Sequence, residues 1–540
     1  MSSPSFPGSA MLARAKDHPR AVEPIVLLLT VGLSVLGALI GLHLVTTLGI
    51  TANTSVIGAL IAMLTARVPI AAMRKMRSVH RQNLVQSAIS GSTFAAANSL
   101  LVPIAVPFAL GQPDLVWPML AGASIGLVVD SWVLYRVFDS KLYPGRHPWP
   151  PGVAAAETII AGDQGGRRAG ILGGGAVIGV LGTLAKLPMS AAGVALIGNM
   201  WALLMFGIGL FITQYVPGWT GIDLKSLYIP HGVMIGAGMV ALGQAIAILA
   251  RKQQKAPSDQ DTERRPGDVT VDESGLRRGI IEGYVLFTLG AVVVGVIGGV
   301  LGDLSAWHLV LWVLFAGFAA LVHELIVGLA AMHSGWFPAF AVTLIFLILG
   351  LILNFPTVPL AILVAYCAST GPAFADMGYD FKAGWILRQG ATPHALVERY
   401  GRKQQYIAQL VGFAVALVVV AVAWQAYFND GRIPPVSEVY AATIQAGISD
   451  TSTLVNLLLW AIPGALIQFI GGPSRQMGIL LATGLLILSP YACWLVLGAL
   501  AVRVVWTRLR PGAESELALV GAGIIAGNSL FETTRVLQSD

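Results

Sequence analysis

The first apolar segment of the chain, residues 25–48, reads IVLLLTVGLSVLGALIGLHLVTTL and carries no Asp, Glu, Lys or Arg. A helix of about 20 apolar residues spans the hydrocarbon core of a bilayer, so this segment is long enough to cross one. It follows a polar, basic stretch, residues 1–23, and it is too long for the core of a cleavable signal peptide. It therefore predicts a membrane-spanning helix and a cytoplasmic N-terminal tail.

Similar apolar segments fill most of the 540 residues. Hydrophobic residues make up 56% of the chain and charged residues only 11%, whereas a soluble protein carries about 25% charged residues. This composition predicts an all-α polytopic membrane protein. The further apolar segments lie near 53–72, 83–110, 115–138, 170–186, 190–215, 226–250, 279–301, 307–331, 336–354, 357–376, 405–427, 440–470 and 476–502.

The net charge of +6 is a topology signal rather than a sign of nucleic-acid binding, because Lys and Arg occur in short runs between apolar segments. The positive-inside rule places these basic loops in the cytoplasm. All of them fall on that side only if the short segments 149–162 and 381–397 also cross the membrane. This gives about sixteen crossings in all. The clusters at 167–168 and 402–403 then fall outside, against the rule. Re-entrant hairpins at these places are the alternative. The loops expected inside are 73–81, 136–147, 251–278 and 503–510.

The chain also contains short stretches that resemble each other, as internal repeats do. Leu28 to Gly32, with glycines at 37 and 41, matches Leu286 to Gly290, with glycines at 295 and 299. Such matches favour two parallel eight-helix repeats, an architecture common among carriers, although Gly- and Leu-rich helices also resemble one another by composition alone. The expected organisation is a tail (1–23), a first transmembrane repeat (24–250), a basic cytoplasmic linker (251–278), a second repeat (279–510), and a short apolar C-terminal segment and tail (511–540).

Polar side chains inside apolar segments are costly and therefore mark candidate functional positions. In the first such cluster, Asn83 and Gln86 are three residues apart and share a helix face, followed by Ser90 and Thr93. These groups could bind substrate, or they could join helices by hydrogen bonds. Pro103 and Pro107 are expected to kink or break the helix that carries them.

The second cluster begins with the prolines and glycine of residues 148–152, which predict a fresh helix N-terminus. Glu157 follows one or two turns later among alanines. It is a candidate proton-carrying group or contact for a substrate amine, and the alternative is an interfacial glutamate that faces water.

The third cluster runs from Asp376 to Gln409. Asp380 and Lys382 could neutralise each other, which lowers the cost of burying both charges. The amide side chains of this cluster are candidates for hydrogen bonds to substrate: Gln404, Gln405 and Gln409.

His323 and Glu324 form a further candidate pair, because a histidine beside a carboxylate titrates near neutral pH; a stray pair at a helix end is the alternative. The two cysteines, Cys367 and Cys493, cannot build a metal motif. With no nucleotide-binding or hydrolase motif in the sequence, we expect no cofactor and no metal site.

The three clusters carry a resemblance to a known family. Asn83-Leu84-Val85-Gln86-Ser87 resembles the asparagine–glutamine signature of the oligopeptide transporter family, which includes the yellow stripe-like carriers. Residues 148–157 resemble its proline–glycine–alanine–glutamate segment, and 380–384, 390–393 and 403–405 resemble its longest block. The chain departs from the family at Gln82, where a glutamate is expected, and by the insertion 394–401.

The resemblance, to a prokaryotic-type member of this family, implies that the chain takes up small peptides or peptide-like metal chelates with protons, through the cytoplasmic (inner) membrane. Expected partners are membrane lipid, substrate and protons, with a homodimer left open. A channel, a facilitator and an integral membrane enzyme are the alternatives, and the enzyme is disfavoured because the carboxylates are scattered singly. The candidates for proton coupling are Glu157, Asp376, Asp380, Lys382, His323 and Glu324; those for substrate binding are Asn83, Gln86, Ser90, Thr93, Gln404, Gln405 and Gln409.

Overall fold

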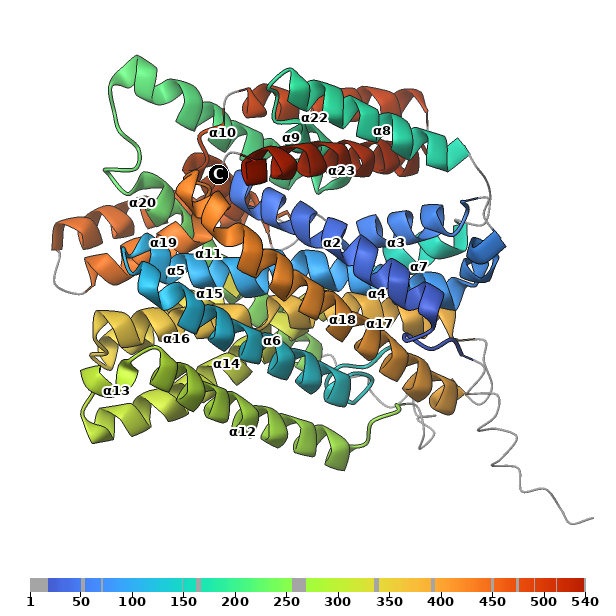
Figure 1. Ribbon diagram of the computed structural model, residues 1–540. Coiled ribbons are helices and arrows are strands. Elements are labelled where there is room, and N and C mark those ends of the chain that lie inside the picture. Colours follow the sequence, from blue (N-terminus) through green and yellow to red (C-terminus); the bar gives the residue numbers. More distant parts are fainter. Residues whose placement is uncertain are drawn as a thin grey trace, which may run out of the picture.

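The computed structural model describes most of the chain, and every regular element in the described part is a helix (Figure 1). The described residues are 18–49, 54–68, 71–147, 149–161, 167–254, 269–334, 339–389, 394–447, 451–472, 475–489, 491–510 and 512–538. The helices of the first part of the chain are α2 (Pro24–Thr47), α3 (Thr54–Thr65), η1 (Ala71–Arg77), α4 (Val79–Phe94), η2 (Ala95–Leu101), α5 (Val102–Ala109), η3 (Pro113–Leu115), α6 (Val116–Val137), α7 (Pro150–Ala161), α8 (Arg167–Leu184), α9 (Met189–Ile197), α10 (Met200–Thr220) and α11 (Ile229–Gln254).

The second part of the chain continues in the same way. Its helices are α12 (Glu273–Ile297), α13 (Val300–Asp303), α14 (Ala306–Ser334), α15 (Ala339–Ile352), α16 (Thr357–Ser369), α17 (Pro372–Leu387), α18 (His394–Asn429), α19 (Pro435–Ala446), α20 (Thr451–Gly471), α21 (Met477–Leu486), α22 (Ala492–Leu509) and α23 (Glu514–Gln538).

Nine helical stretches in the described part are long and apolar enough to cross a membrane, and shorter apolar helices accompany them. This confirms the all-α polytopic class. Two of the nine, Val79–Ala109 and Thr357–Leu387, are 94% buried over their most apolar windows, whereas Ala492–Leu509 is only 22% buried. The two buried stretches therefore form the centre of the molecule, and they hold the first polar cluster and the acidic residues of the third.

The helix that carries the first polar cluster does not break at its prolines. Val79–Ala109 is helical throughout, and η2, a π-helical segment, lies directly before Pro103. A proline inside a helix lacks an N–H donor and clashes with the carbonyl four residues earlier. A wider π turn relieves that clash while the backbone stays helical. The structure therefore shows a π-helical segment here instead of a break.

The other central stretch does break. α16 ends at Ser369 and α17 starts at Pro372, with Gly371 between them at a φ of +83°. α17 thus completes the span that α16 begins, and α18 starts a new one at His394. Residues 381–397 are therefore not a separate crossing. α7 has 12 residues, or about 18 Å of helix, which is too short for a hydrocarbon core of about 30 Å.

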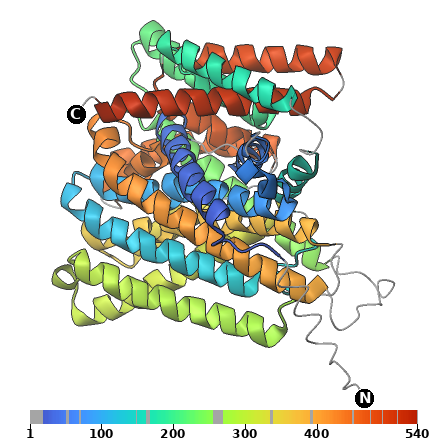
Figure 2. The same ribbon diagram turned by 45° about the vertical axis from the view of Figure 1, so that its right-hand side comes forward.

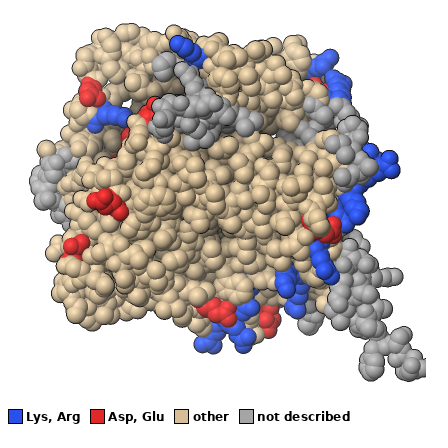
Figure 3. Space-filling model, in the orientation of Figure 1, with Lys and Arg blue, Asp and Glu red and all other residues tan. Residues whose placement is uncertain are grey.

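Because neither 381–397 nor α7 forms a separate crossing, the expected topology must be corrected. Arg402 Nη1 donates a hydrogen bond to the carbonyl of Phe138 at 2.7 Å, and Arg399 Nε donates to the carbonyl of Thr270 at 3.1 Å. The cluster at 402–403 therefore lies on the same side as the loop 136–147 and the end of the linker, and not on the opposite side. Likewise, Arg167 forms an ion pair with Glu516 at 3.4 Å, next to the basic end of α22. Lys and Arg gather along one edge of the molecule, while the broad middle is largely uncharged (Figure 3).

Helices from the two parts of the chain interleave rather than forming two separate bodies. α8 packs along α23, α10 along α21, and α11 along α20. Figures 1 and 2 both show the red C-terminal helix beside the green helices. The contacts are close because glycines meet backbone: a Cβ at Gly236 would lie 1.8 Å from the carbonyl oxygen of Ala461. Small residues at such crossings are typical of membrane helices.

Candidate functional site

Side chains from distant parts of the sequence meet around Asp380 on α17. Its carboxylate is fully buried and accepts hydrogen bonds from Ser55 Oγ on α3 at 3.1 Å, from Gln86 Nε2 on α4, and from Gln409 Nε2 on α18 at 2.8 Å. All three donors are neutral. Three helices thus surround one acidic group without supplying a cation to it.

Asp376 lies one turn earlier on the same face of α17 and joins this group. Ser90 Oγ lies 2.9 and 3.0 Å from its two carboxylate oxygens, and Ser55 Oγ lies 3.4 Å from the nearer one. Ser55 is therefore within reach of both carboxylates. The first and third predicted clusters form one buried site, which we call the α17 site: Ser55, Gln86, Ser90, Asp376, Asp380 and Gln409.

Two polar atoms at this site have no hydrogen-bond partner among the described residues. They are the hydroxyl of Tyr379, between the two acidic residues in sequence, and Oε1 of Gln409. Buried polar groups in proteins are normally paired, so these atoms offer one donor and one acceptor to a molecule that enters the site. A backbone peptide group presents the matching acceptor and donor.

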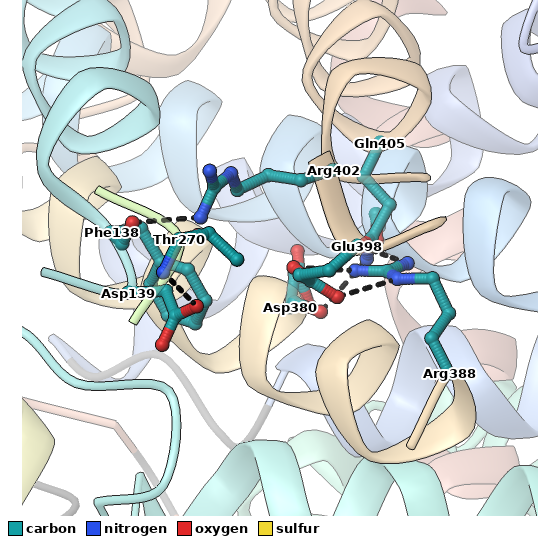
Figure 4. A network of polar contacts seen from close by, with 9 residues as sticks. Phe138, Asp139, Thr270, Asp380, Arg388, Glu398, Arg402 and Gln405 are labelled. Atoms are coloured by element: carbon teal, nitrogen blue, oxygen red, sulfur yellow. Dashed lines mark hydrogen bonds and ion pairs between the residues drawn. The ribbon is translucent and has the colours of Figure 1, made fainter. Parts of the chain in front are cut away.

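Gln405 connects the α17 site to a buried ion pair (Figure 4). Its Nε2 donates to the backbone carbonyl of Asp380 at 2.8 Å and to Ser87 Oγ at 3.0 Å. Its Oε1 accepts from Arg388 Nη1 at 2.8 Å. Arg388 in turn pairs with Glu398 at 2.8 Å, and both side chains are fully buried. Glu398 comes from the insertion 394–401. This departure from the family pattern therefore supplies the carboxylate that holds Arg388 next to Gln405.

The remaining candidates of the amide clusters lie at the margins of the site. Asn83 Nδ2 donates to Gln86 Oε1 at 3.0 Å, which confirms that the two share a helix face. Gln404 Oε1 accepts from the backbone N–H of Ala21 at 2.9 Å. Thr93 Oγ1 donates to the carbonyl of Ile89 in its own helix, at 2.7 Å, away from the carboxylates.

Lys382 does not pair with Asp380, contrary to the sequence-based expectation. Its Nζ donates to the carbonyl of Gly145 at 2.8 Å and lies 4.5 Å from the centre of the Trp385 ring. Residues two apart on a helix point in different directions, so the same helix cannot present both groups to one site. Lys382 instead fastens α17 to the loop after α6.

Glu157 lies apart from the α17 site. On α7, the neighbouring Ala155 and Ala156 are buried, whereas the side chain of Glu157 is exposed. Two predicted segments, the proline at 148 and residues 390–393, lie outside the described residues.

His323 and Glu324 lie well inside α14, not at its end, and both are fully buried. His323 is held by Thr370 Oγ1 at 3.2 Å, by the carbonyl of Ala339 at 3.0 Å and by Thr343 Oγ1 at 3.0 Å. Glu324 does not face His323. It lies beside Asp130 of α6, a buried acidic residue that the sequence patterns did not single out.

The N-terminal segment packs beside the buried Arg388, which contacts Gln405 next to the α17 site. His18 is buried beside the rings of His80, at 4.9 Å, and Tyr400, at 6.3 Å. Burial, together with the positive charge of Arg388, lowers the pKa of His18 from 6.5 to about 3. The adjacent Glu23 pairs with Arg81 at 2.8 Å. Residues 18–23 are therefore tied to both α4 and α18.

A helical membrane protein whose broken central helix carries two buried carboxylates, contacted by amides from neighbouring helices, is, as a class, built like a carrier. The family model described as OPT oligopeptide transporter protein matches residues 24–224 and 189–533. The chain therefore belongs to the oligopeptide transporter family, whose members are transporters rather than enzymes. No curated protein and no solved structure matches the chain in the two other comparisons.

Proposed function

We propose that the protein is a secondary active symporter that uses an inward proton gradient to take up oligopeptides or peptide-like metal chelates. The observation that carries this proposal is the α17 site. Asp380 is fully buried and surrounded by neutral donors, with Asp376 one turn away. Two carboxylates close together at low dielectric repel each other, so a proton that binds one of them removes a large electrostatic cost.

The same site suits a peptide-like substrate. The Tyr379 hydroxyl and Gln409 Oε1 are available for new hydrogen bonds, and the amides of Gln86 and Gln405 can exchange their present partners for peptide groups. A substrate that displaces donors from Asp380 makes its ionised form more costly and so favours protonation. Substrate and proton binding would be linked through this one carboxylate, as symport requires.

The topology that we propose follows from charge. The basic edge of the molecule would face the cytoplasm, together with the N-terminal segment, and the helices would pass through the cytoplasmic membrane many times. For the complete architecture we propose two repeats with fewer than sixteen crossings, because 149–162 and 381–397 do not form separate spans.

The test is uptake into proteoliposomes that contain the purified protein, with an imposed inward proton gradient. Labelled di- to pentapeptides and iron–siderophore complexes are the probes. Wild-type protein should accumulate at least one of them only while the gradient lasts. Asp380→Asn should lower gradient-driven accumulation about 100-fold, since it removes a buried charge and its charge-assisted hydrogen bonds, together worth about 3 kcal/mol.

The matched control is Asp303→Asn, because Asp303 is an exposed acid on α13. It should transport like the wild type. Uptake that is equally fast without a gradient would refute proton coupling and leave a facilitator or channel. Unchanged accumulation in Asp380→Asn would remove the α17 site from the mechanism.

A further inference from the structure

A second pair of buried acidic residues lies outside the α17 site. Asp130 on α6 and Glu324 on α14 are both 0% exposed, and their carboxyl groups lie beside each other. Asp130 Oδ1 accepts a hydrogen bond from the backbone N–H of Gly371 at 2.8 Å. Its other oxygen and both oxygens of Glu324 have no hydrogen-bond partner among the described residues.

The pair lacks the neighbouring cation that two ionised carboxylates need. No Lys or Arg in the described part of the chain is ion-paired or hydrogen-bonded to either group. Two ionised carboxylates side by side in a buried site repel strongly, and each also loses its solvation. One proton between them removes a charge and supplies the O–H donor that the unpartnered oxygens lack.

The groups around the pair offer no other source of that donor. The Tyr143 hydroxyl donates to the carbonyl of Leu325 at 2.8 Å, and the Tyr366 hydroxyl donates to the carbonyl of Phe287 at 3.0 Å. His323 is engaged with Thr370, Thr343 and Ala339. Four other charged groups on the helices packed here have partners of their own: Asp376 with Ser90, Asp380 with Gln409, Lys382 with Gly145, and Glu282 with Arg136.

A hydrogen bond links Asp130 to the break between α16 and α17. Gly371, whose N–H is held by Asp130, separates α16 from α17. The neighbouring Thr370 is held by His323, the residue before Glu324. α17 carries the α17 site on the far side of this break. A change at the acidic pair therefore reaches Asp376 and Asp380 through a single helix.

We propose that Asp130 and Glu324 form a second proton-binding site, in which one carboxyl group donates its proton to the other, and that this proton holds the α16–α17 break in its present form. Binding converts one carboxylate to a carboxylic acid, and release returns the proton to solvent when α17 moves. The coupling role rests on the proposed symport, whereas the presence of the proton does not.

The first experiment therefore needs no substrate. Infrared spectra of the purified protein in liposomes, recorded during a pH titration, report the carbonyl stretch of protonated carboxyl groups. Wild-type protein should keep such a band at about pH 7, where exposed carboxyl groups, with a pKa of about 4, have lost their protons. Glu324→Gln should lose one component of that band, Asp130→Asn should shift it, and Glu324→Asp should restore it.

Asp303→Asn is the control for an exposed carboxyl group, and Asp380→Asn separates the contribution of the α17 site. A Glu324→Gln spectrum equal to that of the wild type at neutral pH would overturn the proposal. So would a Glu324-dependent band that disappears when sodium replaces choline, because the occupant would then be a metal cation.

The second experiment tests coupling with whichever labelled peptide or siderophore complex the wild type accumulates. At a gradient of one pH unit, the accumulation ratio falls about tenfold for each coupled proton that is lost. Glu324→Gln should show this fall while substrate exchange without a gradient continues within about twofold of the wild-type rate. An unchanged ratio would refute the coupling role alone. Absence of gradient dependence in the wild type would refute the proposed symport and leave the infrared result standing.

Discussion

The two buried acidic pairs differ in the number of hydrogen-bond donors around them. In the α17 site, Asp376 and Asp380 are contacted by Ser55, Ser90, Gln86 and Gln409 from three other helices. At the second pair, the backbone N–H groups of Gly371 and Phe374 contact Asp130, and Glu324 has no hydrogen-bond donor among the described residues. Both pairs are buried to a similar degree.

This difference indicates different tasks. Neutral donors on side chains can rotate away and bind an incoming molecule, so the α17 site can exchange partners without breaking the backbone. The second pair presents only acceptor oxygens without partners, and one proton supplies the donor that they lack. We therefore infer that substrate recognition belongs to the α17 site, and that the second pair holds a proton at the helix break.

The largest expected effect comes from removing the support of the α17 site. Arg388→Ala removes the ion-pair partner of the buried Glu398 and releases Gln405. Loss of one partner of a buried ion pair costs about 3–5 kcal/mol. Thermal unfolding in detergent, followed by tryptophan fluorescence, should show this as a large decrease in Tm. The double variant Arg388→Met with Glu398→Leu should recover most of it, since it removes both charges of this ion pair.

If the double variant is as unstable as Arg388→Ala, the bond to Gln405 carries the effect rather than the ion pair. Transport by the double variant then tells the two roles apart. A stable double variant that fails to accumulate substrate would show that Arg388 orients Gln405 for binding.

The next effect concerns the helix break. Gly371 adopts a φ of +83°, and a Cβ there would lie 2.7 Å from His323 Nδ1. Gly371→Ala should cost about 2–4 kcal/mol, from the backbone conformation and the overpacking together. Gly299 is a matched control with a φ of +78° and nothing within 4 Å of its added Cβ. Gly299→Ala should lower the free energy of unfolding by only about 1–2 kcal/mol in the same measurement.

Equal losses in the two glycine variants would show that His323 moves aside freely and that the break is not tightly held. That result would weaken the connection between the second pair and α17.

The sequence predicted the class of the fold because length and apolar composition alone identify a helix that can span a bilayer. It predicted the crossings less well. α7 was counted as a crossing although it is too short, and α17 was counted apart from α16 because Gly371 does not interrupt the apolar pattern around it. Hydropathy registers composition, not the φ angle of one glycine.

The candidate site could be predicted where polar groups repeat at helical spacing, as for Gln86 with Ser90 and Gln405 with Gln409. Ser55 and Asp130 were missed because a single polar residue in an apolar helix has no periodic signal. Lys382 was misassigned, since nearness in sequence does not place two side chains on one helix face. Only the packing of separate helices reveals which acid meets which donor.

A smaller effect separates donors to the carboxylates from ordinary polar groups on the same helix. Ser90→Ala removes the hydroxyl that contacts both oxygens of Asp376 and should cost about 1–3 kcal/mol of stability or apparent substrate affinity. Ser92→Ala is the control, because the buried Ser92 hydroxyl donates to the carbonyl of Ile89 in its own helix, at 2.9 Å. Equal KM values for the two variants would contradict a special role of Ser90.

The smallest effect is a pH dependence of the attachment of residues 18–23 to α4 and α18. The pKa of His18 is about 3 when buried and about 6.5 when exposed. Because the buried form binds protons less well, residues 18–23 are held most tightly above pH 6.5 and are progressively released as the pH falls toward 3. At pH 5.5 their attachment should weaken about tenfold, or about 1.4 kcal/mol. Hydrogen exchange of the Ala21 amide, which donates to Gln404, measures this after correction for the intrinsic rate. His18→Gln, which stays neutral, should show no such pH dependence. If this variant keeps the wild-type dependence, a group other than His18 controls the attachment of residues 18–23.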